Sequence, residues 1–322
     1  MEVVALAGGV GGAKMASGLY QVLPPENLTI VVNVGDDFEH LGLKICPDLD
    51  TVCYTLAGIA NPGTGWGRDE ETWNAFESMS QLGGPDWFRL GDRDLGTHLA
   101  RSHLLARGFK LDQVIEEFCH AWGVSAKILP VSNDAVPTLV LTDEGQLSFQ
   151  EYFVHRQCQP RVRGFEFEGI AKALPVPAVL QALENAQLII ICPSNPWVSI
   201  DPILKVPGVM ESLMVHHEAD RRAVIAISPI IAGKALKGPA AKMYMELGIT
   251  PSALAVAQHY CKVDQKGFLT GFVFDKVDFN YQEAIDALSI KIFLTDTVMN
   301  TPNDRKRLAE EVIAFGINLI EG

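Results

Sequence analysis

Short apolar runs alternate with amphipathic segments along the chain, a pattern that predicts a β-sheet covered by helices. Residues 3–7 form the first apolar run, which stops at two glycines, and residues 13–23 follow with helical spacing. Residues 28–34 form a second run, rich in β-branched side chains. This series of strand, glycine-rich loop, helix and strand predicts a right-handed βαβ unit. We therefore predict an α/β fold, with a Rossmann-like, mostly parallel sheet and helices on both faces.

The remainder of the chain extends the same pattern. Further buried strands are expected over residues 127–130, 188–192, 223–227, 270–274 and 291–294. Helices are expected over residues 73–79, 96–107, 111–122, 177–184 and 303–319. Residues 138–142 and 146–153 flank an Asp-Glu-Gly turn and predict a β-hairpin. We predict a single α/β nucleotide-binding domain over residues 1–322, with a mainly helical insertion at about residues 51–126.

Composition and charge limit the classes of partner. The chain has 322 residues, enough to bury a large core without disulfides, and its six cysteines form no Cys-x-x-Cys pair, so we expect reduced and mostly buried thiols. A net charge of −13 argues against nucleic acid and anionic membranes as partners. The chain lacks an apolar run of about 18 residues and a signal-peptide pattern at its start. We therefore expect a cytoplasmic protein.

An acidic protein that binds phosphates must provide its anion site locally, and the first candidate is the loop after the first strand. Gly9, Gly11 and Gly12 leave backbone N–H groups exposed at a helix start, and Lys14 adds a charge. The segment is neither a dinucleotide motif, since Lys14 occupies the place of the third glycine, nor a P-loop, since Met15 follows the lysine. The alternative is a structural turn with Lys14 in solvent.

Acidic side chains follow the second predicted strand. Asp36 and Asp37 come after Asn33, and Asp48 and Asp50 would face the same way if their segment is extended. Paired carboxylates near phosphates recruit Mg²⁺, or one of them accepts the proton of an attacking hydroxyl. The alternatives are turn residues for the first pair and a helix N-cap for Asp50.

Two arginines lie in the charged segment 89–98. Arg89 or Arg93 would suit a ligand's anionic or polar edge, because a guanidinium can bind in a bidentate manner; the alternative is a solvated turn with local ion pairs. His98 and His103 are five residues apart and have no evident third ligand, so we expect no zinc site.

Donor-rich turns also follow two later strands. Ser194 and Asn195 come after residues 188–192, and Ser228 comes after residues 223–227. Each is an ordinary turn by itself, but together these strand ends describe one anion-binding cleft, because ligands in parallel sheets bind beyond the carboxyl ends of strands.

Several remaining aromatic and histidine residues are assigned more simply. Trp66 lies in a glycine-rich segment that suits a mobile lid over an aromatic substrate. The other tryptophans are expected in the core. The run His216-His217-Glu218 is expected at the surface.

Taken in order, these motifs resemble the 2-phospho-L-lactate transferase family of coenzyme F-420 biosynthesis. The resemblance extends over nearly the whole chain and is most specific at Pro47-Asp48-Leu49-Asp50-Thr51 and Leu90-Gly91-Asp92-Arg93-Asp94. The glycine loop is less specific, since a related group of uridine-sugar-binding proteins shares it.

The resemblance implies a reaction, and together with the motifs described above it leads to a set of candidate site residues. A guanosine diphosphate that carries a three-carbon acid, lactyl or enolpyruvyl, would pass its acid-bearing phosphate to the ribityl hydroxyl of the deazaflavin FO and release GMP. Mg²⁺ and a homodimer are expected. Asp48 and Asp50 are the candidate catalytic residues, and Asp37 joins them as a candidate metal ligand. The candidate deazaflavin residues are Asp50, Arg89 and Trp66, and the candidate guanosine diphosphate residues are Gly9, Gly11, Gly12, Lys14, Ser194, Asn195 and Ser228.

Two other classes of function compete with this one. The first is a nucleotide-sugar-binding regulatory protein on the same scaffold, which would bind without turnover. The second is a nicotinamide oxidoreductase, against which the missing third glycine and Asn33 argue, because such enzymes place an acidic residue there to bind ribose.

Overall fold

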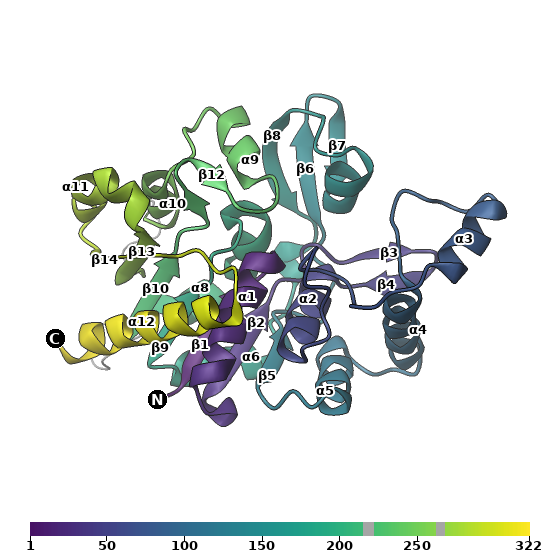
Figure 1. Cartoon of the computed structure of the whole chain (residues 1–322), viewed down its shortest axis with the longest axis horizontal. Helices are drawn as coiled ribbons and strands as arrows, with labels where there is room; N and C mark the ends of the chain where they lie inside the picture. The colour runs from purple at the N-terminus through teal and green to yellow at the C-terminus, as the bar shows by residue number, and fades with distance from the viewer. Residues whose placement is uncertain (215–221, 262–267) are drawn as a thin grey trace.

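The computed structural model describes residues 1–214, 222–261 and 268–322 (Figure 1). Its centre is a seven-stranded sheet in the order β14-β13-β10-β9-β1-β2-β5, and every pair of neighbours in it is parallel. The strands are β1 (Val3–Ala7), β2 (Leu28–Val32), β5 (Lys127–Pro130), β9 (Leu188–Ile191), β10 (Ala223–Ile227), β13 (Gly271–Asp275) and β14 (Lys291–Thr295). The predicted α/β class and parallel sheet are confirmed.

The order of the strands reverses beside β1. The strands β2 and β5 follow β1 on one side of the sheet, and β9, β10, β13 and β14 follow one another on the other side. Val3 in β1 pairs with both Leu28 and Leu188. A reversal of this kind leaves a crevice at the carboxyl ends of the two central strands. All residues of β1, β9 and β10 are buried, as expected for strands covered on both faces.

Helices cover both faces of this sheet (Figure 1). One layer contains α1 (Gly9–Val22), α2 (Pro47–Leu56) and α12 (Pro302–Glu321), and α1 packs against both of the others. The helix α1 begins at Gly9, four residues before the predicted start, because the glycine loop itself forms the first turn. Behind the sheet lie α6 (Pro177–Asn185) and α8 (Val209–Met214), which pack on each other.

The segment between β2 and β5 contains a hairpin and three further helices that extend to the right in Figure 1. The helices α3 (Asn74–Gln81), α4 (Asp92–Ala106) and α5 (Leu111–Ala121) begin and end within four residues of their predicted bounds. The hairpin of β3 (Phe38–His40) and β4 (Leu43–Ile45) was not predicted, because strands of three residues are too short to show an alternating pattern. The division of the chain into domains remains a prediction.

A second, antiparallel sheet stands above the central one in Figure 1. It consists of β6 (Thr138–Thr142), β7 (Gly145–Ser148) and β8 (Val162–Phe167), so the predicted hairpin is confirmed. The prediction of a strand as far as residue 153 is wrong, since Glu151–His155 form a wide helical turn. Phe149 and Phe153 are four residues apart, which is a helical spacing, and their rings stack at 5.5 Å.

Short elements complete the described part of the chain. They are η1 (Pro25–Asn27), η3 (Ile170–Lys172), η4 (Pro196–Ile200), α7 (Asp201–Leu204), β11 (Ile230–Ile231), β12 (Lys234–Ala235), α9 (Ala240–Glu246), α10 (Ala253–Tyr260), η5 (Lys276–Tyr281) and α11 (Gln282–Asp286). All six cysteines are free thiols and four of them are buried, as predicted. Among the described residues, no helix is long and apolar enough to cross a membrane. The run 216–218 lies outside the described residues.

Candidate active site

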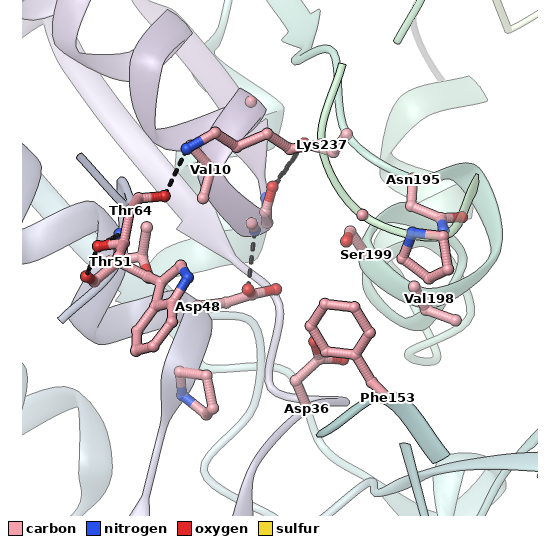
Figure 2. A pocket seen from close by; sticks show the side chains of 18 of the residues that line it. Val10, Asp36, Asp48, Thr51, Thr64, Phe153, Asn195, Val198, Ser199 and Lys237 are labelled. Atoms are coloured by element: carbon pink, nitrogen blue, oxygen red, sulfur yellow. Dashed lines mark hydrogen bonds between the residues drawn. The ribbon is translucent and has the colours of Figure 1, made fainter. Parts of the chain in front are cut away.

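A cavity of about 750 Å³ opens at the carboxyl ends of β1, β9 and β10, where the sheet order reverses (Figure 2). Gly11, Asp50, Arg89 and Asn195, which are up to 184 positions apart in the sequence, all line it. The structure thus brings together most of the candidate residues: Gly9, Gly11, Lys14, Asp48, Asp50, Trp66, Arg89, Ser194, Asn195 and Ser228. Gly12 and Asp37 are not among the lining residues.

The glycine loop forms the floor between β1 and β9. Gly9 has a φ of +62°, a left-handed conformation that favours glycine, and it starts α1. A Cβ on Gly11 would lie 2.2 Å from the carbonyl oxygen of Pro193, so this position has no room for a side chain. Ser194 closes the contact by donating its hydroxyl to the carbonyl of Gly8 at 2.8 Å. The first turn of α1 carries no acidic side chain, and its N-terminus therefore favours an anion.

Gly12 and Ser228 have local structural contacts. A Cβ on Gly12 would lie 2.7 Å from the hydroxyl of Ser194, so Gly12 allows the two loops to pack closely behind the cavity wall. The hydroxyl of Ser228 donates to the carbonyl of Ile230 and accepts from its N–H, which fixes the turn after β10.

Two buried carboxylates face the cavity beside the glycine loop. Asp48 accepts the N–H of Gly9 at 2.8 Å and the side-chain amide of Asn33 at 2.9 Å. The same amide lies 3.3 Å from a carboxylate oxygen of Asp36. Asn33 thus joins Asp36 and Asp48, and both acids line the cavity (Figure 2).

Burial controls the ionisation of this pair. It raises the pKa of Asp48 to about 6, although the hydrogen bonds from Asn33 and Gly9 work against that shift. Burial and the neighbouring charge of Asp48 raise the pKa of Asp36 well above its ordinary value. In the described part of the chain, no lysine or arginine forms an ion pair with either carboxylate. A buried acid pair without a positive partner is the environment in which a cation is most stabilising.

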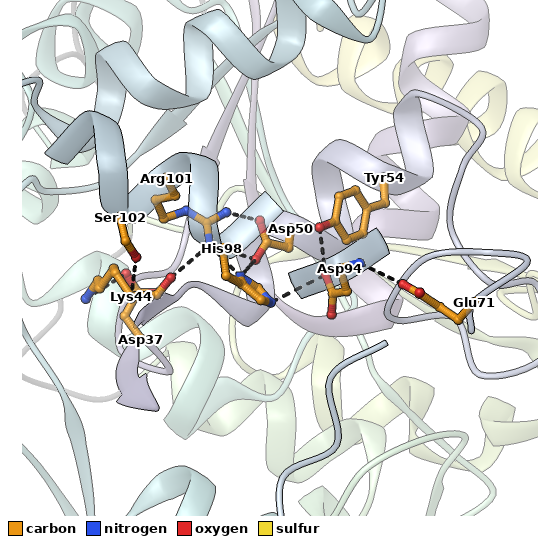
Figure 3. Close-up of polar contacts among 9 residues, drawn as sticks. All are labelled: Asp37, Lys44, Asp50, Tyr54, Glu71, Asp94, His98, Arg101 and Ser102. Atoms are coloured by element: carbon orange, nitrogen blue, oxygen red, sulfur yellow. Dashed lines mark hydrogen bonds and ion pairs between the residues drawn. The ribbon is translucent and has the colours of Figure 1, made fainter. Parts of the chain in front are cut away.

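Asp50 lies on a different side of α2. The expectation of an extended segment is wrong, because α2 begins at Pro47, whose fixed φ suits the first helical position. Residues two positions apart on a helix point in different directions, so Asp48 turns to the glycine loop while Asp50 turns to α4. There both carboxylate oxygens of Asp50 accept from Arg101 (Figure 3). Asp50 is therefore not the helix N-cap, a position that Cys46 occupies.

Asp37 and Arg93 are engaged in ion pairs away from the cavity lining. The carboxylate of Asp37 lies 3.3 Å from the ammonium of Lys44 in β4. The guanidinium of Arg93 lies 3.1 Å from Glu70, with both side chains largely exposed, which is the solvated ion pair considered for this segment.

A metal site would rest on few protein ligands. Among the residues that the structure describes, no three His, Cys, Asp or Glu side chains gather in a group that could hold a metal. Mg²⁺ is commonly held by one or two carboxylates together with substrate phosphates and water, so the pair of Asp36 and Asp48 fits this ion. Asp36 lines the cavity and Asp37, the predicted metal ligand, does not; consecutive residues in a turn cannot be told apart by pattern.

Two lysines lie at the opposite side of the glycine loop, each bonded to a backbone carbonyl. Lys14 donates to Met299 at 2.8 Å, and Lys237 donates to Thr64 (Figure 2). Burial and the nearby charges of Arg305 and Lys237 lower the pKa of Lys14, so an anion near it would be stabilising. Lys237 thereby holds the glycine-rich segment that carries Trp66, whose side chain is 54% exposed at the cavity mouth.

Aromatic side chains form another wall of the cavity. Arg89 lies over the ring of Trp73 at 4.5 Å, which fixes its guanidinium at the mouth. Trp87 was expected in the core but lines the cavity and stacks on His155 at 5.3 Å. Phe88, Phe149 and Phe153 also line it. The sequence offered two signals for this wall: the aromatic pair directly before Arg89, and the helical spacing of the two later phenylalanines.

This arrangement defines a class of protein. A helix start suited to an anion, an acid pair suited to a cation and a set of aromatic side chains surround one cavity at the reversal point of a parallel sheet, which is where parallel-sheet proteins bind nucleotides.

The comparisons with known proteins identify the family. Residues 3–298 match the family model described as 2-phospho-L-lactate transferase CofD. A phosphoenolpyruvate transferase of Streptomyces griseus is 40% identical, with 98% of this chain and all of that protein covered. One of Kitasatospora aureofaciens is 38% identical over the full length of both chains. The chain therefore belongs to the CofD family of 2-phospho-L-lactate transferases in coenzyme F-420 biosynthesis, and it is a transferase.

A solved structure supports the fold independently. A protein of the UPF0052 family from Bacillus halodurans superposes with a TM-score of 0.64 at 15% identity, covering 97% of this chain and 98% of that one. At this identity the likeness concerns the fold alone. Family membership decides against both the non-catalytic regulator and the nicotinamide oxidoreductase.

Proposed function

We propose that the protein transfers a phosphorylated three-carbon acid from a guanosine diphosphate donor to the terminal ribityl hydroxyl of the deazaflavin FO, with release of GMP. The observation that carries this proposal is that one cavity combines an anion-binding helix start with an aromatic wall and a pair of carboxylates. The hydroxyl oxygen bonds to the acid-bearing phosphorus, the bond from that phosphorus to the GMP oxygen breaks, and the hydroxyl proton leaves to a base or to water.

In this proposal the donor diphosphate binds at the glycine loop. Backbone N–H groups at Gly11 and the N-terminus of α1 supply fixed dipoles, and Lys14 and Lys237 supply charge within reach of the same loop. Ser194 and Asn195 follow β9 and line the cavity beside the loop, which suits the nucleoside side of the donor. Phosphoryl transfer depends mainly on positioning and charge neutralisation, and these groups supply both.

In this proposal the deazaflavin binds against the aromatic wall. Its flat heterocycle matches the rings of Trp87, Phe88 and Phe153, and Trp66 would cover it from the mouth. Arg89 and Asp50 then offer a donor and an acceptor to its polar groups, the roles that the family resemblance gives them.

We assign Mg²⁺ to Asp48, with Asp36 as the second carboxylate in place of Asp37 or Asp50. When bound, the ion would neutralise charge on the diphosphate oxygens. The Oδ1 atom of Asp48 accepts the N–H of Gly9, and its Oδ2 atom accepts the amide of Asn33. The same side chain would therefore link the cation to the glycine loop. Asn33 keeps the two carboxylates at a fixed separation and orientation.

A transfer assay tests the proposal. Purified protein would be incubated with Mg²⁺, the deazaflavin and either the lactyl or the enolpyruvyl guanosine diphosphate, and the products identified by mass spectrometry. We expect GMP and the deazaflavin phosphodiester in equal amounts, and the preferred donor identifies the acid. Absence of product with both donors, from a folded protein that binds neither substrate, would contradict the proposal.

We further propose a homodimer that acts in the cytoplasm. The resemblance to the family supports the dimer, and a solution mass of about twice 35.1 kDa by light scattering is the expected result. A mass equal to that of one chain at working concentrations would contradict it.

A further inference from the structure

Arg101, in α4, is a fully buried arginine behind the wall of the cavity. It has 0% exposed surface, although its guanidinium is always charged and such residues are almost never completely buried without a partner. It donates to both carboxylate oxygens of Asp50, at 3.1 Å for the pair of Nη1 and Oδ2 (Figure 3). It also donates to the carbonyl of Lys44, and its Nη1 lies 3.1 Å from the imidazole Nδ1 of His98. Arg101 itself does not line the cavity, whereas Asp50 and His98 do.

The buried ion pair of Arg101 and Asp50 is not explained by stability alone. Removing two charges from water costs several kcal/mol for each ion, and apolar residues of the same size commonly replace such pairs without loss of stability. The Nε of Arg101 is buried without a hydrogen-bond partner in the described part of the chain, which adds to the cost. An arrangement that is this costly and lies against a ligand cavity indicates a role in binding.

His98 packs between Arg101 and a second acid of the cavity wall, Asp94. The Nδ1 atom of His98 lies 3.1 Å from Nη1 of Arg101 and 3.7 Å from Oδ2 of Asp50. The Nε2 atom faces a carboxylate oxygen of Asp94 at 3.5 Å, and the same oxygen accepts the hydroxyl of Tyr54 at 2.7 Å (Figure 3). Arg101 therefore connects two acids of the cavity wall, Asp50 directly and Asp94 through His98.

We propose that Arg101 is a positioning residue for the acceptor substrate: its two-pronged contact holds the Asp50 carboxylate in one orientation, with its remaining lone pairs available to hydrogen-bond donors of the deazaflavin. The inference rests on the proposed function, since it takes Asp50 as a contact of that substrate. It also leaves the cation to Asp36 and Asp48, because Arg101 already neutralises the charge of Asp50.

The substitution that separates positioning from packing is Arg101→Lys. Lysine keeps the charge and most of the volume but has a single ammonium, which cannot fix both oxygens of a carboxylate. We expect the dissociation constant for the deazaflavin to rise about tenfold, with that for the guanosine diphosphate donor changed less than about twofold. Affinity is measured by titration of deazaflavin fluorescence, so the readout does not require turnover.

A double-mutant cycle shows whether the effect passes through Asp50. In an Asp50→Asn background the carboxylate is gone, and we expect Arg101→Lys to change deazaflavin affinity by less than about twofold. If Arg101→Lys lowers deazaflavin affinity by the same factor in that background as in the native protein, Arg101 acts independently of Asp50, which would overturn the inference. Guanidinium added to Arg101→Ala, which can fill the space left by the side chain, is expected to restore part of the affinity.

A matched control separates general destabilisation from the specific effect. Arg222 is also buried, at 8% exposed, and it donates to the backbone carbonyls of Ala186 and Ser212 at the amino end of β10, away from the cavity. Arg222→Lys is expected to lower stability while leaving deazaflavin affinity unchanged. Equal losses of affinity in the two variants would overturn the inference. If the native protein binds no deazaflavin at all, both the proposed function and this inference fail, whereas an additive cycle overturns the inference alone.

Discussion

At the scale of single residues, the site depends on close approach between loops and on buried charge. Glycines let the loop after β1 contact the loop after β9, and Asp36 and Asp48 are buried without an ion pair to any lysine or arginine that the structure describes. Neither feature follows from pattern alone. The sequence places Gly11 in a turn, but the contact with Pro193 arises only when two distant strand ends become neighbours.

Gly11→Ala tests the loop contact. A methyl group at this position would lie 2.2 Å from the carbonyl oxygen of Pro193, so the two loops must separate. We expect a loss of about 1–3 kcal/mol in the free energy of unfolding and at least a tenfold loss of donor affinity. Gly96→Ala in α4 is the control, since its Cβ meets nothing within 4 Å, and it should be neutral or stabilising. Chemical denaturation and donor titration measure both; a stable, fully active Gly11→Ala would contradict the described geometry.

The ionisation of Asp48 predicts a pH dependence. Its pKa is raised from 3.8 to about 6, so the folded protein retains a proton that the unfolded chain loses in this range. The contribution of Asp48 to stability is therefore present below pH 3.8 and is lost as the pH rises through about 6. A bound cation reverses this balance by favouring the ionised form.

Thermal unfolding with and without Mg²⁺ tests this prediction. We expect the ion to raise the melting temperature clearly at about pH 7.5 and hardly at about pH 5, where the carboxyl is protonated. Asp48→Asn is expected to remove the effect at both pH values. An equal stabilisation by Mg²⁺ in that variant would show that the cation binds elsewhere.

At the scale of elements, the segments that were predicted correctly are those with a strong local pattern. The predicted apolar strands and long helices match the structure. A strand buried on both faces leaves a continuous apolar run in the sequence, and a helix buried on one face leaves a helical period. The strand β8, the third strand of the antiparallel sheet, was not predicted, because its buried positions are confined to its two ends and Gly164 interrupts it. The direction of Asp50 was predicted wrongly because Pro47 starts a helix where an extended segment was expected.

The tether between two loops gives a prediction at this scale. Lys237 donates to the carbonyl of Thr64 and so holds the segment with Trp66 against the glycine loop. Lys237→Met should release this segment, which would make chymotryptic cleavage after Trp66 several-fold faster and weaken donor binding about tenfold. Lys242→Met is the control, since Lys242 pairs with Glu246 and does not line the cavity. An unchanged cleavage rate would show that the tether does not hold the segment.

At the scale of the whole molecule, the topology explains why scattered motifs form one site. The strand order reverses beside β1, so the loops after β1 and β9 open a crevice, and the antiparallel sheet and the insertion helices complete its walls. The sequence predicted the sheet and the edge at which the candidate residues gather, because the carboxyl ends of parallel strands share one edge. It did not predict the aromatic wall or Arg101, because these depend on how α4 and the second sheet pack over that edge.

The central claim is that one cavity holds a diphosphate and a deazaflavin together, and a crystal structure with GDP, Mg²⁺ and the deazaflavin tests it most directly. We predict the phosphates at the N-terminus of α1, the cation on Asp48 with Asp36, and the heterocycle beside Arg89 and Asp50. Density for the two ligands in separate cavities, or phosphates bound away from Gly9 and Gly11, would contradict the account.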